Sequence, residues 1–176
     1  MRLAYADPPY PGQARRHYKN DPSGIVAEEV DHKELIEHLL QHYDGWALST
    51  NEPGLEYIKD LFPKGFFKEN HIRIAPWVKP WCSWKIWNRV KYTWEPVLYV
   101  PTRPKGSKEV TPVRDHIIAG ATKGTGTCGA KPPEFCDWIL DILGWQPGDT
   151  VDDLFPGSGA FTEAVKRREK YAEAIG

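Results

Sequence analysis

The sequence has 176 residues with 40% hydrophobic content, which is enough for one buried core and too little for two, so we expect a single domain over residues 1–176. Its formal net charge of −1 hides an asymmetry, because residues 64–108 carry +8 and the remainder carries −9. The absence of a membrane-length apolar run, a signal-peptide pattern and a Cys-x-x-Cys pair predicts a soluble cytoplasmic protein without a membrane partner, disulfide framework or zinc site.

The first predicted element is a buried strand over residues 3–6 that runs into Asp7, Pro8, Pro9 and Tyr10. The two prolines lack N–H groups and hold their carbonyl acceptors rigidly, while the strand end places Asp7 where open α/β sheets bind ligands. The ring of Tyr10 can lie against a planar group. This set suits the exocyclic amino group of an aromatic base that has left its stack. Taken alone, the motif is more typical of a proline-rich turn after a strand.

The polar residues 11–30 predict a flexible loop that is longer than most connections. Within it, Arg15, Arg16 and Lys19 lie close in sequence to the base-binding corner. They are candidates for phosphate contacts, and a solvated loop is the alternative.

A helix is predicted from Asp31, whose side chain can cap it, and it is followed by a strand over residues 46–50 and a short helix over 52–62. His38 and His42 are spaced to share one helix face, but the pattern supplies no third ligand. We therefore expect no metal site.

The basic region carries two further strand candidates, residues 71–75 and 96–100, with an irregular segment over 76–94 between them. Tryptophans are interleaved with cations in this segment, an arrangement that suits phosphates and unstacked bases. Alternatively, the tryptophans fill the core and the cations solvate the outer face. The candidate phosphate-binding cations here are Lys79, Lys85, Arg89 and Lys91.

Residues 101–130 are rich in Pro, Gly, Lys and Thr and predict a second flexible loop. A helix over residues 132–143 should follow, because prolines occupy its first turn and Gly144 can end it. The next strand, ending near Asp153, leads into a glycine-rich turn and a last helix over residues 160–172. Glycines allow a close backbone approach to a ligand, and a helix N-terminus favours electronegative groups.

Together these motifs resemble the amino-group methyltransferases that use S-adenosylmethionine (SAM), in the permuted order in which the catalytic motif precedes the cofactor motif. The catalytic motif is Asp-Pro-Pro-Tyr at residues 7–10. The cofactor motif, Asp-x-Phe-x-Gly-x-Gly, is at residues 153–159, and a Lys-Pro motif that closes over the methionine end of the cofactor is at residues 131–132. Tyr10 favours the DNA adenine N6 enzymes over the messenger-RNA adenosine enzymes, which usually carry Trp there, and Ser in place of Asp7 would point to cytosine.

The resemblance implies a role for each matched residue. Asp7, Pro8, Pro9 and Tyr10 would be catalytic. The residues implied in cofactor binding are Lys131, Pro132, Asp153, Phe155, Gly157, Ser158 and Gly159. The substrate implied is DNA, with RNA left open.

The sequence departs from the family at its end, because relatives continue into strands that bind the ribose and adenine of the cofactor. We therefore expect an α/β, Rossmann-like methyltransferase sheet of about five strands, with helices on both faces and the cofactor strand at or near an edge. An exposed edge invites pairing with a second copy or a partner subunit. A nucleic-acid-binding module without turnover, or one subunit of a hetero-oligomeric enzyme, is therefore an alternative to a self-sufficient methyltransferase.

Overall fold

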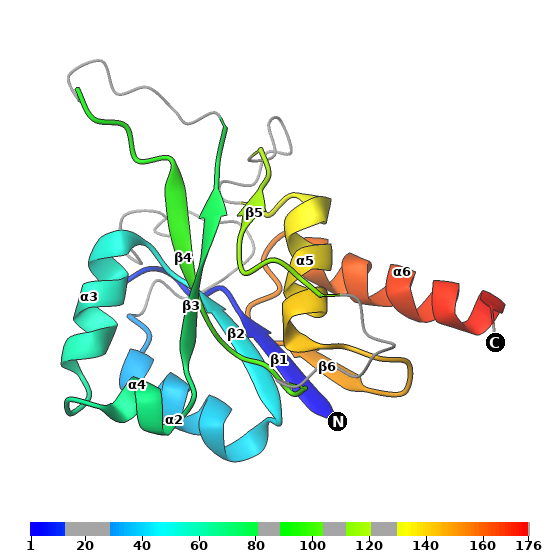
Figure 1. Cartoon of the computed structure of the whole chain (residues 1–176), viewed down its shortest axis with the longest axis horizontal. Coiled ribbons are helices and arrows are strands. Elements are labelled where there is room, and N and C mark those ends of the chain that lie inside the picture. The colour runs from blue at the N-terminus through cyan, green and yellow to red at the C-terminus, as the bar shows by residue number, and fades with distance from the viewer. Residues whose placement is uncertain (13–28, 81–88, 104–111, 121–129, 176) are drawn as a thin grey trace.

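The computed structural model describes residues 1–12, 29–80, 89–103, 112–120 and 130–175 (Figure 1). Within these ranges the strands form one six-stranded sheet in the order β5-β3-β4-β2-β1-β6. The strands are β1 (Arg2–Ala6), β2 (Gly45–Ser49), β3 (Arg73–Val78), β4 (Trp94–Val100), β5 (Ile117–Ile118) and β6 (Thr150–Asp153). The helices are α2 (His32–His42), α3 (Glu52–Asp60), α4 (Phe66–Glu69), α5 (Pro133–Leu143) and α6 (Ala160–Ile175).

The middle of the sheet contains both strand directions. β1 runs parallel to its two neighbours, β2 and β6, whereas β4 is antiparallel to both β2 and β3. β6, the strand before the glycine-rich turn, pairs with β1 and forms one edge of the sheet, as expected.

The sheet differs from the expected five strands in two respects. Residues Ile117 and Ile118, predicted to lie in a loop, form the short strand β5 beside β3. The segment 76–94 is also less irregular than predicted, because β3 continues to Val78 and β4 begins at Trp94. Pro76, which with Pro80 suggested the irregular segment, lies within β3 directly opposite Pro96 of β4.

Alternation along β1 explains why helices cover both faces. Leu3 and Tyr5 point into one apolar cluster with residues of α5 and α6, while Ala4 and Ala6 point into another with residues of α2 and α3. Figure 1 shows α2, α3 and α4 on one side of the sheet and α5 and α6 on the other. The predicted α/β architecture with helices on both faces is confirmed.

The helix ends follow local sequence signals. Asp31 caps α2 by accepting from the backbone N–H groups of Lys33 and Glu34, and Asn51 caps α3 by accepting from that of Gly54. Gly144 ends α5 with a φ of 77°, a left-handed conformation that favours glycine. Among the helices described, none is both long enough and apolar enough to span a membrane.

Candidate active site

The two long sequence motifs follow neighbouring parallel strands. Tyr5 of β1 is paired with Asp153 of β6, so the corner at Asp7 and the glycine-rich turn leave the sheet side by side at the carboxyl ends of their strands. This is the position at which open α/β sheets bind ligands. Pairing of the first and last strands thus brings together the residues at the two ends of the sequence.

Lys131 joins this corner through an ion pair. Its ammonium nitrogen lies 2.6 Å from Oδ2 of Asp7, and its side chain is only 8% exposed. The same nitrogen is 6.0 Å from the ring centroid of Tyr10 and 5.7 Å from that of Trp77. A buried cation therefore lies against the candidate catalytic carboxylate and close to two aromatic rings.

Tyr10 is held by a partner on β4 that the sequence did not indicate. Its hydroxyl donates to Oε2 of Glu95 over 2.9 Å, and the other carboxylate oxygen of Glu95 pairs with Lys79. The Lys79 ammonium also lies 4.5 Å from the centroid of the Trp77 ring. Burial, together with the nearby charges of Asp7 and Glu95, raises the pKa of Tyr10 well above its ordinary value, so the phenol stays protonated. The only hint in the sequence is that Glu95 is one of two acidic residues in the basic region.

Asp153 carries an unsatisfied carboxylate oxygen at the glycine-rich turn. Its Oδ2 accepts from the hydroxyl of Thr162 over 2.8 Å, whereas Oδ1 is buried and has no hydrogen-bond partner. Burial raises the pKa of this carboxyl group. An orphaned buried acceptor costs stability unless a ligand donates to it.

The turn itself has the backbone that its glycines predict. Gly157 and Gly159 have φ values of 45° and 76°, and a side chain added at Gly159 would point into open space. Phe155 is half-buried beside Asp153, and Ser158 is exposed. The turn therefore offers backbone groups and a hydroxyl to a ligand next to the unsatisfied carboxylate.

The structure describes three of the seven cations that are predicted to bind nucleic acid. Lys79 is engaged in the ion pair with Glu95, Arg89 is exposed, and Lys91 is half-exposed. Arg15, Arg16, Lys19 and Lys85 lie outside the described residues, as do Cys82 and Cys128. Phosphate binding by this set stays a prediction.

No cluster of three or more metal-ligating side chains occurs among the residues described. His38 and His42 are exposed on α2, with ring centroids 4.4 Å apart. Cys136 is fully buried, and this burial raises the pKa of its thiol to about 12. The charges of Lys131 and Asp153 both act on the thiol, so Cys136 lies near the candidate site, whereas the two histidines lie on α2.

Comparison with known proteins identifies the fold. No protein-family model and no curated protein matches the sequence. Among solved structures, the chain is similar to the crystal structure of an M1.HpyAVI–SAM complex, with a TM-score of 0.60 and 22% identity over 96% of this chain and 79% of that one. A crystal structure of M1.HpyAVI gives a TM-score of 0.54 and 20% identity over 95% and 76% of the two chains. The chain therefore shares its fold with M1.HpyAVI.

Proposed function

We propose that the protein transfers a methyl group from SAM to the N6 amino group of adenine in DNA. The observation that carries the proposal is the adjacency of the Asp7 corner to the turn at Asp153, whose buried Oδ1 lacks a donor. The likeness to a protein crystallised with SAM supports the same cofactor.

The residues present fit SAM. Asp153 offers an unpaired buried acceptor for a cationic group, and the open turn at Gly157 and Gly159 offers room for close backbone approach. Phe155 and Ser158 complete the turn, and Lys131, the residue before the N-cap Pro132 of α5, is tied to the corner by its ion pair with Asp7. SAM bound here would supply an electrophilic methyl group.

The chain's own contribution is to hold and orient the target amine. Lys131 occupies Oδ2 of Asp7, which leaves Oδ1 to accept a hydrogen bond from the amine. The carbonyl of Pro8 provides a second acceptor, and the ring of Tyr10 lies against the flipped base. Two acceptors draw the amine's lone pair back onto nitrogen, and the carboxylate stabilises the positive charge that develops there. As the new N–C bond forms, the bond from the methyl carbon to the sulfur of SAM would break, and the methylated nitrogen would then release a proton to water.

The test is methylation of an oligonucleotide pool by the wild type and by Asp7→Asn. We expect mass spectrometry to detect N6-methyladenine with wild type and at least a hundredfold less with the variant, because an amide acceptor cannot stabilise the developing charge. SAM binding, measured by calorimetry, should persist in Asp7→Asn.

The matched control is Asp60→Asn, which changes an exposed carboxylate on α3 and should leave methylation unchanged. Equal pools of DNA and RNA separate the two substrate classes. Full activity of Asp7→Asn, or methylation of RNA alone, would contradict the proposal.

A second candidate is favoured by the position of β6 at the sheet edge. A strand that is paired on one side only can accept a second copy or a partner subunit, which would make this chain one part of an oligomeric methyltransferase. The mass of the purified chain in solution, measured with and without SAM, distinguishes a monomer from a homodimer. A folded monomer that binds DNA but transfers no methyl group would instead indicate a binding module or a missing partner.

A further inference from the structure

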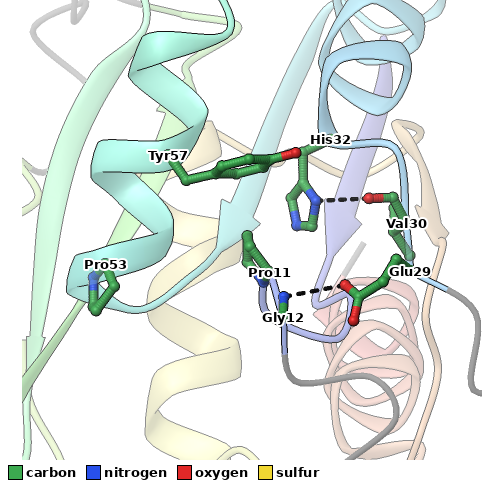
Figure 2. Close-up of a pocket in the computed structure, with 7 residues that line it drawn as sticks. All are labelled: Pro11, Gly12, Glu29, Val30, His32, Pro53 and Tyr57. Carbon is green, nitrogen blue, oxygen red and sulfur yellow. Dashed lines mark hydrogen bonds between the residues drawn. The ribbon is translucent and has the colours of Figure 1, made fainter.

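A pocket opens at the residues that follow Tyr10. It has a volume of about 500 Å³ and is wide open to solvent, and Figure 2 shows its lining residues. They come from the chain just after Tyr10, from the start of α2 and from the start of α3: Pro11, Gly12, Glu29, Val30, His32, Pro53 and Tyr57.

His32 supplies an unused acceptor in this pocket. Its Nδ1 lies 2.9 Å from the carbonyl oxygen of Val30, and a carbonyl can only accept, so Nδ1 carries the hydrogen. His32 is 1% exposed, and its other ring nitrogen, Nε2, is buried without a hydrogen-bond partner. Burial lowers the pKa of His32, so the ring is neutral and Nε2 presents a lone pair. In Figure 2 the edge of the ring that carries Nε2 faces the side of the pocket formed by Pro11 and Gly12.

The other groups favour a flat ligand that donates hydrogen bonds. The Glu29 carboxylate accepts from the backbone N–H of Gly12 over 3.1 Å, so a negative charge already occupies the pocket and disfavours phosphate. Pro11 and Pro53 provide apolar walls. The Tyr57 ring is 47% exposed and lies edge-on to His32, at 6.2 Å between centroids. An aromatic ring that carries an amino group can pack against these apolar walls and donate a hydrogen bond to the free acceptor.

The pocket is tied to the candidate catalytic corner by the main chain. Pro11 and Gly12 directly follow Tyr10, so the wall of the pocket begins at the residue after the candidate catalytic corner. A side chain added at Gly54 would come within 3.2 Å of Pro11, which shows how closely the start of α3 approaches the same corner.

We propose that this pocket binds an unpaired nucleobase neighbouring the target adenine and selects it through its exocyclic amino group, which donates to Nε2 of His32. This inference rests on the proposed function and specifies which neighbouring nucleotides the enzyme accepts.

The test combines changes to the protein with changes to the DNA. A DNA library in which the neighbours of one adenine are randomised is methylated separately by the wild type, by His32→Phe and by His32→Gln. The neighbours of the methylated adenines are then identified. The preferred neighbour is then replaced by an analogue without the amino group, purine for adenine or 2-pyrimidinone for cytosine. His38→Phe alters an exposed histidine on the same helix and is the matched control. Thermal unfolding checks each variant, and Tyr57→Ala, a change at an exposed ring, tests the pocket if His32→Phe does not fold.

Wild type and His38→Phe should lose about tenfold in kcat/KM on the analogue, the cost of one hydrogen bond to a buried acceptor. His32→Phe should already show the tenfold lower kcat/KM on natural DNA, and the analogue should cause no further loss. The kcat/KM of His32→Gln should lie between those of wild type and His32→Phe. Equal sensitivity of wild type and His32→Phe to the analogue, or no neighbour preference in the wild type, would overturn the inference.

The two proposals fail separately. If wild type methylates nothing, the proposed function is wrong, and the same oligonucleotides, with the neighbouring base left unpaired, still test the pocket through their binding to Asp7→Asn, followed by fluorescence anisotropy. A tenfold affinity difference between natural and analogue oligonucleotides that disappears in Asp7→Asn/His32→Phe would support the pocket. An unchanged difference would contradict it.

Discussion

The hydroxyl of Tyr10 sets the orientation of the ring that we propose lies against the target base. Its acceptor, Glu95, is itself fixed by Lys79, and Lys79 rests on the buried ring of Trp77. Each of these side chains restricts the rotamers of the next one, so less side-chain conformational entropy is lost when a base binds. Glu95 is thus a positioning residue that acts through Tyr10.

We expect Tyr10→Phe and Glu95→Gln to lower kcat/KM for DNA by about three- to tenfold, the range for one hydrogen bond, with unchanged SAM affinity. The double variant should cost little more than either single change, because both act on one contact. Steady-state kinetics and calorimetry measure the two quantities. Tyr92→Phe, the same change at a 70% exposed ring in the same region, is the comparison, and strictly additive losses in the double variant would argue against the coupling.

The start of α3 is an element whose close packing shapes the corner after Tyr10. Gly54 lies in its first turn, where an added Cβ would meet Asn51 Oδ1 at 2.8 Å and Pro11 at 3.2 Å, with Thr50 Oγ1 closer still. Thr50 is completely buried and cannot yield easily. Helix propensity favours Ala over Gly by about 1 kcal/mol, but overpacking costs about 1–3 kcal/mol. We therefore expect the cost of overpacking to exceed the gain in helix propensity.

Gly54→Ala should therefore lower the free energy of unfolding by about 1–2 kcal/mol and reduce methylation through the displaced Pro11. Urea denaturation measures the first effect and single-turnover kinetics the second. Gly120→Ala is the control, because nothing lies within 4 Å of a Cβ added there. A higher free energy of unfolding for Gly54→Ala would show that the gain in helix propensity outweighs the steric cost.

Local signals predicted most elements, and long-range contacts account for what they missed. Some elements depend only on residues that are neighbours in sequence, so their patterns predicted them. These are the helix cap at Asp31, the helix end at Gly144 and the strands before Asp7 and after Asp149. β5 and the ends of β3 and β4 were missed because each is stabilised by a partner strand: Pro76 opposite Pro96, and Ile117 beside Trp77. Such pairing overrides the local preference of proline to end a strand.

At the scale of the whole molecule, Asp149 ties β6 to the rest of the sheet. It receives two hydrogen bonds from Arg103, at 2.8 and 3.1 Å, and one from the amino group of Met1 at 2.8 Å. Burial opposes the ionised carboxylate, but these donors, with the N–H of Gln146, outweigh it and lower the pKa to about 2. The side chain is only 5% exposed, so screening by solvent is weak.

This carboxylate should make stability sensitive to acid. Since its pKa falls from an ordinary 3.8 to about 2 on folding, its contribution is complete above about pH 4 and is lost as the pH falls toward 2. Asp149→Asn should cost about 1–2 kcal/mol at pH 7 and flatten the stability profile between pH 4 and 2. Chemical denaturation across this range measures it, with the exposed Asp115→Asn as reference; parallel profiles for wild type and Asp149→Asn would contradict the assignment.

The proximity of the two long motifs was predictable, because each follows directly after a strand. Asp7, Lys131 and Asp153 were identified from motifs far apart in the sequence, and the β1–β6 pair brings two of those motifs together. Glu95 and His32 were not singled out, because a glutamate in a β-rich stretch and a histidine at a helix start have no distinguishing pattern. Only the register of β4 and the packing of α2 reveal their partners.

The pairing of β1 with β6 also bears on how the chain folds. β1 is the first strand to be synthesised, yet its register with Thr150 to Asp153 forms only after nearly all of the sequence is available. Contacts of such long sequence separation slow folding, and until β6 arrives the inner strand β1 has an open edge. The candidate active site thus cannot assemble until β6 has been synthesised, and shorter nascent chains expose at β1 unpaired backbone that is prone to aggregation.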